Sequence, residues 1–252
     1  GVEITKAVYR KVRDKEYYGF LEVDIECPKD LYHPLLPRKG DKLFFDLQDK
    51  RGVWTTKEIY KAVELGYVIT KIYEVRYYER TTTELFKGYV SKFLKIKQEA
   101  SDYPDWCGDQ SDKDKYIAEY LENQGIALDP TKIEKNPGMR AIAKLCLNSL
   151  WGKFGQRSNM GKCVICKDKG QFYKIIMDEK HENIHWFEVG SDPPKLQVSY
   201  SIKDKYVESD YNTSIAIASF TTSSARLRLY VALEYLNRQV LYFDTDSVVY
   251  KY

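Results

Sequence analysis

Two aspartates separated by one residue carry the sharpest chemical signal in the sequence. Asp244 and Asp246 stand between two short apolar stretches, residues 240–243 and 248–250, which predict two strands joined by an acidic turn. We expect the two strands to be buried, and placing carboxylates beside buried apolar strands costs free energy. Such a costly arrangement indicates a functional role for the two aspartates. Their hard oxygen atoms suit Mg²⁺ or Mn²⁺ better than zinc. A bare Asp-x-Asp is more often only an acidic turn, and its meaning depends on the rest of the chain.

A second set of residues suited to chemistry lies on one face of a helix predicted from Pro137 to position 151. Asn136 is a good N-cap, and proline is favoured at the first helical position. At about 100° per residue, four side chains fall within about a quarter turn of this helix. They are Arg140, Lys144, Asn148 and Trp151. Such a face can meet a ligand that is anionic and planar, whereas the alternative for the tryptophan is a place in the core.

The elements that must position these residues predict an α+β fold without internal repeats. Expected strands are 18–25, 42–47 and 67–78, followed later by short strands within 160–211. Expected helices, besides the one just described, are 55–64, 83–99 and 213–237. Glycines should end two of these helices: Gly66 ends the first, and Gly152 with Gly155 ends the helix that carries Lys144.

Composition describes an ordinary globular, intracellular chain. The 252 residues are 43% hydrophobic, and no apolar run is long enough for a membrane span. The net charge is only +3, but charge is segregated. Residues 132–162 contain seven Lys or Arg and one acid, whereas residues 99–129 contain nine acids and two lysines. We therefore expect a phosphate-binding surface beside a solvated insertion.

The five cysteines do not predict a disulfide scaffold. Their number is odd and their spacing irregular, which fits a reducing compartment. Cys163 and Cys166 form a Cys-x-x-Cys pair, but no second pair follows and the next histidines are His181 and His185. A zinc ribbon needs more ligands at suitable spacing, so both cysteines are interpreted as strand residues.

Three motifs, in the same order along the chain, resemble those of family B DNA polymerases. Residues 242–247, YFDTDS, resemble the YxDTDS motif, and residues 144–152, KLCLNSLWG, resemble KxxxNSxYG. Between them, residues 222–226, TSSAR, are similar to a TxxGR-type element that holds template and primer. The resemblance implies a polymerase palm, an antiparallel sheet with helices, together with helical fingers. It also implies nucleotide addition by two Mg²⁺ or Mn²⁺ ions, with Asp246 as a metal ligand and Asp244 ligating or supporting the site.

The same resemblance assigns roles to further residues. Lys144 and Arg140 would bring positive charge to the triphosphate, as would Lys97 from the preceding fingers helix. Lys132 competes with Lys97 for that last role because of its spacing from Lys144, although the residues around Lys97 match better. Asn148, Trp151 and Gly152 would lie against the nascent base pair, with tryptophan in place of the usual tyrosine. Residues implied to contact DNA are Thr222, Arg226 and Tyr242.

The subgroup indicated is the protein-primed one, similar to the polymerases of large self-synthesising DNA transposons and related viruses. Its features here are residues 19–37, which resemble the first protein-primed insertion, and residues 85–101, which resemble the first fingers helix. The expected domains are 1–82 (palm with the first insertion), 83–156 (fingers), 157–212 (second insertion or palm strands) and 213–252 (palm with the hairpin). Expected partners are template and primer DNA, deoxynucleoside triphosphates and a terminal priming protein, with no membrane, in the nucleus or a viral replication compartment.

The family's first palm motif, DxxSLYP, which supplies the other metal-binding aspartate, does not occur in this sequence. We expect it upstream of Gly1, so that residues 1–252 alone would not add nucleotides. One alternative is a non-catalytic DNA-binding remnant of a polymerase, although the intact Asp-Thr-Asp argues against decay. A reverse transcriptase or RNA polymerase would also place acids in a hairpin turn, but it gives no reason for KxxxNSxWG.

A possible exonuclease motif is rejected. Asp24 and Glu26 mimic the Asp-x-Glu of a proofreading domain, but they lie too close in sequence to Lys144. Residues at alternating positions in a strand share a face, so we expect both acids on the polar face of a strand.

Overall fold

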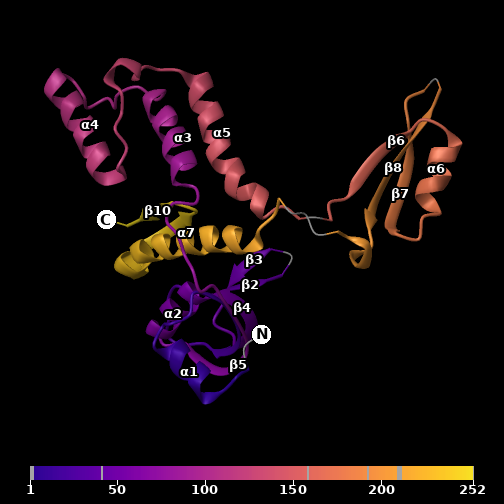
Figure 1. The fold of residues 1–252 in the computed structure, drawn as a ribbon, viewed down its shortest axis with the longest axis horizontal. Coiled ribbons are helices and arrows are strands. Elements are labelled where there is room, and N and C mark those ends of the chain that lie inside the picture. Colours follow the sequence, from indigo (N-terminus) through magenta and orange to yellow (C-terminus); the bar gives the residue numbers. More distant parts are fainter. Residues whose placement is uncertain (1–2, 41, 158, 192, 209–211, 252) are drawn as a thin grey trace. The chain divides into compact units, whose positions relative to one another are not determined.

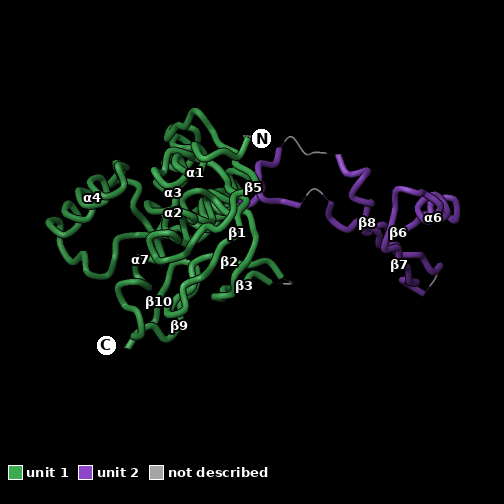
Figure 2. Tube along the Cα trace, turned by 90° about the horizontal axis from the view of Figure 1, so that it is seen from below, with its two compact units in different colours: residues 1–151, 216–252 green, residues 152–215 purple. Residues whose placement is uncertain are grey.

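The computed structural model describes residues 3–40, 42–157, 159–191, 193–208 and 212–251. The chain forms two compact units (Figure 2): unit 1 contains residues 1–151 and 216–252, and unit 2 contains residues 152–215. Both combine helices with antiparallel sheets (Figure 1), which agrees with the predicted α+β class. No helix in the described part of the chain is long and apolar enough to cross a membrane.

A three-stranded antiparallel sheet forms the centre of unit 1. Its strand order is β4-β1-β5, with β1 at Gly19–Glu26, β4 at Lys50–Thr55 and β5 at Val68–Tyr77. Alternation along β1 buries one face: Leu21, Val23 and Ile25 are at most 1% exposed. The other face is polar, and Asp24 accepts a hydrogen bond from the Tyr73 hydroxyl at 2.7 Å. The interpretation of Asp24 as a polar-face strand residue is thus confirmed.

Local signals define the helix that follows β4. Helix α2, Thr56–Glu64, begins with a capping box in which Thr55 and Glu58 satisfy each other's backbone N–H groups. Gly66 follows with φ +92°, a conformation that glycine adopts without strain. Ile59 and Ala62 of α2 are fully buried and join the core with Val8 and Val12 of α1, Lys6–Arg13. The predicted helix is confirmed to within one residue.

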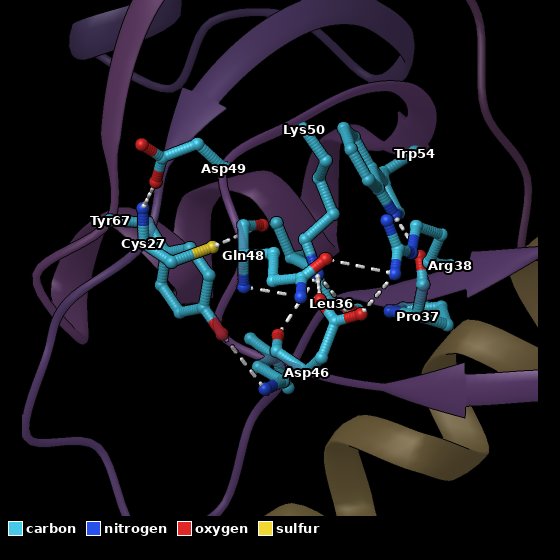
Figure 3. Close-up of polar contacts among 11 residues, drawn as sticks. Cys27, Leu36, Pro37, Arg38, Asp46, Gln48, Asp49, Lys50, Trp54 and Tyr67 are labelled. Atoms are coloured by element: carbon cyan, nitrogen blue, oxygen red, sulfur yellow. Dashed lines mark hydrogen bonds and ion pairs between the residues drawn. The ribbon is translucent and has the colours of Figure 1, made fainter.

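An ion-pair network, buried at Lys50 and partly exposed elsewhere, holds the segment between β1 and β4. This segment contains the short hairpin of β2, Pro37–Lys39, and β3, Leu43–Phe45, so the strand predicted over 42–47 is shorter than expected. Figure 3 shows Asp46 between two cations: Lys50 Nζ lies 2.8 Å from its Oδ1, and an Arg38 terminal nitrogen lies 2.9 Å from its Oδ2. The Lys50 side chain is only 3% exposed. The network fastens the hairpin to the edge of the central sheet.

This network predicts an acid-sensitive contribution to stability. The hydrogen bond from Lys50 holds the pKa of Asp46 below its usual value. A carboxyl with a lowered folded-state pKa stabilises the fold fully above the unfolded value of about 3.9, and this contribution is lost as the pH falls through the folded pKa. Asp46→Asn should therefore lower the free energy of unfolding by ~2 kcal/mol at pH 7, because Lys50 stays buried without its charge partner.

Urea denaturation at a series of pH values from about 6 to 2 measures this effect. The variant should lose less stability than the parent chain as the pH falls below about 4. Asp30→Asn is the matched control, since Asp30 is exposed and should keep the parental pH profile. An unchanged pH profile in Asp46→Asn would contradict the assignment.

Three helices form a second cluster within unit 1. They are α3 at Lys87–Glu99, α4 at Gln110–Gln124 and α5 at Pro137–Phe154, with the short 3₁₀ turn η1 at Pro130–Lys132. The last three residues of α5 belong to unit 2. Helix α3 starts four residues later than the sequence predicted. The acidic stretch expected as a solvated insertion contains α4, and Tyr116, Ile126 and Leu128 form a small core beneath it. The insertion is therefore folded, with Asp109 as N-cap and Gly125 at φ +66° as C-cap.

The C-terminal part of unit 1 returns to the central core. Helix α7, Ile215–Leu236, agrees with the predicted helix within two residues and contributes Tyr230 and Leu233 to the core around β1. The 3₁₀ turn η3, Asn237–Gln239, leads into β9, Val240–Asp244, and β10, Ser247–Tyr250. The hairpin is thus joined through η3 to the end of a helix that is anchored in the core.

Unit 2 has a sheet and a core of its own. Its antiparallel order is β6-β8-β7, with β6 at Lys162–Cys166, β7 at His181–Val189 and β8 at Lys195–Ile202. Helix α6, Lys169–Ile176, packs on one face, and the 3₁₀ turn η2 is Asp204–Tyr206. Cys163 is exposed whereas Cys166 is buried in the core, because side chains an odd number of positions apart in a strand point to opposite faces. The interpretation of both cysteines as strand residues is confirmed.

Candidate active site

The two aspartates lie at the tip of the β9–β10 hairpin. The register pairs Asp244 with Ser247, so Thr245 and Asp246 form the turn, and Thr245 has φ +49°. The Thr245 hydroxyl donates to Asp244 Oδ1 at 3.0 Å, and the Ser247 hydroxyl donates to the Asp244 carbonyl at 3.1 Å. Both carboxylates are exposed at this tip. The predicted strand–acidic turn–strand is confirmed.

The expectation that buried strands flank the aspartates is wrong. Only Val240 is buried and Val248 half-buried, whereas Leu241 is 70% exposed and Tyr242 is 61% exposed. The reason is that β9 and β10 form a two-stranded sheet among the described residues, and such a sheet packs on the core through one face only. The hairpin therefore offers an open apolar face next to its carboxylates.

A cavity of about 590 Å³ lies against that open face. Its walls come from β9, from α7, from β3 and from the loop before β2, and they are mostly aromatic or aliphatic. They include Tyr32, Leu35, Phe45, Tyr230, Leu233 and Tyr242. Burial raises the pKa of the Tyr230 phenol, whose hydroxyl donates to the His33 carbonyl at 2.6 Å. Tyr242, one of the expected DNA contacts, is thus an exposed wall of a preformed apolar recess.

The donor set at the turn fits a hard divalent cation. Asp246 and Asp244 supply carboxylate oxygens, the ligand type that Mg²⁺ and Mn²⁺ prefer. Among the described residues no group of three or more His, Cys, Asp or Glu side chains is arranged to hold a metal ion. The two aspartates would therefore be part of a metal site, completed by further oxygen ligands.

The predicted face of α5 is exposed along its length. Met139 N donates to Asn136 Oδ1 at 3.0 Å, which confirms the cap, and Arg140, Lys144 and Asn148 all point away from the core. Trp151 is 43% exposed, so the alternative of a core tryptophan is not supported. The stacking face inferred from the sequence is thus accessible to a ligand.

Gly152 does not end this helix, contrary to the sequence expectation. Helix α5 continues to Phe154, and only Gly155 lies beyond its end. A Cβ at position 152 would meet no atom within 4 Å. A glycine does not always end a helix, because a glycine inside a helix costs only about 1 kcal/mol, which the rest of the helix can offset.

Two of the expected triphosphate ligands are linked through a serine. Ser101 Oγ donates to the Lys97 carbonyl at 2.6 Å, and Arg140 Nε donates to Ser101 Oγ at 3.1 Å. Lys132, the competitor of Lys97, is paired with Asp129 at 3.2 Å. The structure therefore links the backbone of Lys97 and the side chain of Arg140 through Ser101. No local sequence pattern points to Ser101.

Arg226 has a partner inside the chain. Its Nη2 lies 2.7 Å and its Nε 3.2 Å from Oε1 of Glu58, whose side chain is only 4% exposed. The Thr222 hydroxyl donates within α7, to the carbonyl of Ala218 or Ser219 at 3.1 Å. A DNA contact by either residue stays a prediction, as does a cleft shared by the hairpin and the α5 face. Sequence reasoning missed Glu58, although Thr-x-x-Glu before an apolar run is a recognisable capping signal.

Comparisons with known proteins agree with these motifs. Residues 3–113 and 111–236 match the family described as DNA polymerase type B, organellar and viral. A curated relative, a probable DNA polymerase of Neurospora intermedia, is 21% identical over 236 residues, which are 92% of this chain and 20% of that protein. The chain thus spans about one fifth of the relative's length. No solved structure matches this chain. Because the family match extends through both units to the end of α7, the chain belongs to the type B DNA polymerases of organelles and viruses.

Proposed function

We propose that this chain is part of a DNA-directed DNA polymerase that adds deoxynucleotides to a primer 3′ end in protein-primed replication. The observation that carries the proposal is the exposed Asp-Thr-Asp turn, held at the end of α7 in a chain of this family. The proposed substrates are template and primer DNA and deoxynucleoside triphosphates, and the proposed partner is a terminal priming protein.

In the proposed mechanism the hairpin holds the cations and the helices hold the nucleotide. Bound Mg²⁺ or Mn²⁺ ions would activate the primer hydroxyl and stabilise the pyrophosphate leaving group. Asp246 would ligate them, and Asp244 would ligate or support the site, with its Oδ1 held by a hydrogen bond from the Thr245 hydroxyl. Lys144 and Arg140 neutralise the triphosphate, and positive side chains on a fixed helix do so without reorganisation during the reaction.

The face of α5 also supplies recognition of the new base pair. Asn148 and Trp151 follow Lys144 by one and two helical turns, and both are exposed. An exposed indole gives a planar surface on which a base can stack. As the further lysine that binds the triphosphate we favour Lys97 over Lys132. Lys132 is already paired with Asp129, whereas Lys97 has no ion pair among the described residues.

The helices and sheets divide into parts that suit this mechanism. We assign residues 1–82 and 213–252 to the palm, residues 83–156 to the fingers and residues 157–212 to a second insertion. The small core around Tyr116, which Leu94 of α3 joins, supports the fingers assignment, since it is separate from the core around β1. Lys97 lies on α3, and Arg140 and Lys144 lie on α5, which is linked to the end of α3 by the hydrogen bond from Arg140 to Ser101.

The proposal is tested by primer extension with the full-length polypeptide that carries these residues, in Mg²⁺ or Mn²⁺. Template-dependent extension is expected, whereas DNA binding without any extension would favour the non-catalytic remnant. Residues 1–252 alone are proposed to be inactive, because two carboxylates do not complete a two-metal site.

Lys144→Ala should mainly impair the use of nucleotide. Removing a charge-assisted contact to the triphosphate should raise the KM for nucleotide about tenfold or more, with a smaller effect on DNA affinity. Steady-state extension at varied nucleotide concentration measures this change. Lys92→Ala is the matched control, because Lys92 is also an exposed helical lysine of unit 1. A loss of DNA affinity with an unchanged KM would argue against the role of Lys144.

A further inference from the structure

Ser101 occupies a junction between the two helices that carry the proposed triphosphate ligands. It follows the end of α3, where its backbone N–H donates to the Gln98 carbonyl at 3.1 Å. A serine hydroxyl has one proton to donate and lone pairs to accept. Here the proton goes to the Lys97 carbonyl at 2.6 Å, and the oxygen accepts from Arg140 Nε at 3.1 Å. The Ser101 side chain thus contacts the backbone of Lys97 and the side chain of Arg140.

The surrounding backbone fixes this junction. Glu134 N donates to the Glu99 carbonyl and Asn136 N to the Ala100 carbonyl, both at 3.0 Å. Ser101 itself pairs with Lys135 in an antiparallel bridge. These contacts close the folded insertion that contains α4 and place the first turn of α5 beside the last turn of α3. Arg140, in that first turn, can therefore reach Ser101 across a separation of 39 residues in sequence.

Buried Glu99 adds a second fastening to the same junction. Its Oε1 accepts from Asp129 N at 2.7 Å and lies 3.6 Å from Lys95 Nζ. The Glu99 side chain is 8% exposed, so this carboxylate serves the backbone of the insertion rather than solvent. The position of Ser101 relative to α5 is therefore set by contacts on both sides of it.

The hydrogen bond to Ser101 uses Nε of Arg140 and not its two terminal guanidinium nitrogens. The two terminal nitrogens of Arg140 have no hydrogen-bond partner within residues 3–40, 42–157, 159–191, 193–208 and 212–251. A guanidinium held at Nε keeps a planar pair of donors with a fixed direction, which suits a phosphate oxygen pair. An arginine side chain that is already held in its binding orientation loses less conformational entropy when the phosphate binds.

We propose that Ser101 is a positioning residue, which orients Arg140 and couples it to the α3 turn that carries Lys97 for triphosphate binding. The proposal rests on the polymerase function proposed above and adds a residue that the sequence motifs do not contain. Ser101 does not touch the nucleotide, so its effect should appear in nucleotide affinity and should depend on Arg140.

The test is a double-mutant cycle in the full-length polypeptide, read as KM and kcat for deoxynucleotide in primer extension. Ser101→Ala should raise the KM about fivefold, the factor that one hydrogen bond represents, and change kcat less than about twofold. In an Arg140→Ala background the same change should have no further effect on KM. An equal rise of KM in both backgrounds would overturn the proposal, because Ser101 would then act without Arg140.

Two further variants separate positioning from a general defect in folding. Ser101→Thr keeps the hydroxyl and should retain the parental KM. Arg140→Lys keeps the charge and leaves the Ser101–Lys97 bond untouched, but it has no Nε–H in the same fork, so its KM should rise as in Ser101→Ala. If Ser101→Ala does not fold, a parental KM in Arg140→Lys overturns the proposal and a raised KM supports it.

Ser111→Ala is the matched control, since Ser111 is an exposed serine on α4. It should leave KM and kcat unchanged, and a rise equal to that of Ser101→Ala would overturn the specific role. A full-length polypeptide that binds DNA but does not extend primers would refute the polymerase function itself. Extension with a parental KM in Ser101→Ala would refute only the role of Ser101.

Discussion

Asp246→Ala is expected to lower primer extension by the full-length polypeptide at least about a thousandfold, which corresponds to about 4 kcal/mol of transition-state stabilisation. The side chain lies in the two-residue turn between β9 and β10 and is exposed, so no described packing contact is lost with it. The expected loss is therefore one of metal ligation rather than of folding.

Three measurements separate these possibilities. The free energy of unfolding of Asp246→Ala should stay within about 0.5 kcal/mol of the parent, as for exposed sites in general. Asp246→Asn should also be inactive, because an amide is a weaker ligand for a hard cation than a carboxylate. Asp105→Ala, at an exposed aspartate of the acidic insertion, should extend primers normally. Full extension by Asp246→Ala would leave the remnant interpretation as the better one.

Elements specified by local signals were predictable from the sequence. Helix α2 has a capping box at its start and a glycine with positive φ after its end, and both signals depend only on nearby residues. The β9–β10 hairpin was also predictable, because two short apolar stretches flank a polar turn. Candidate-site residues that share one element were also predictable. Lys144 and Asn148 lie on one face of α5 because they are four positions apart, which is about one helical turn.

Burial and long-range contacts were not predictable. Apolar strands predict burial only if another layer covers them, and β9 has a covered and an uncovered face. Helix α4 was missed because its acidic composition indicates a solvated segment, while its small core depends on Ile126, Leu128 and Ile133, which follow the helix. The contact between Ser101 and Arg140 spans 39 positions, and that between Glu58 and Arg226 spans 168. Such pairs have no local pattern from which to infer them.

Arg226 shows how such a contact changes an expectation. Its place in a motif that resembles a DNA-contacting element predicts weaker DNA binding and a shallower salt dependence when it is removed. Yet its guanidinium binds the Oε1 atom of Glu58, and the same carboxylate accepts from Thr55 in the capping box of α2. The ion pair thus ties α7 to the start of α2, and through α7 it supports the hairpin that carries Asp246.

Arg226→Ala should therefore destabilise the protein by ~3 kcal/mol, because it leaves the carboxylate of Glu58 buried without a charge partner. Denaturation by urea, followed by circular dichroism, measures the loss. Arg228→Ala, at an exposed arginine of the same helix, should change the free energy of unfolding by less than about 0.5 kcal/mol. Adding Glu58→Gln to Arg226→Ala should restore part of the stability, since the unpaired charge is removed.

The double variant also decides whether Arg226 contacts DNA. Compared with Glu58→Gln alone, it lacks only the arginine, so both proteins can be studied folded at the same temperature. A contact with one phosphate would reduce the slope of log affinity against log salt by about 1. If the arginine serves only the ion pair, the two variants should bind primer–template with the same affinity and slope. In that case the motif element on α7 acts by fixing the helix that positions the hairpin, and the positive charges that hold DNA must be sought elsewhere in the chain.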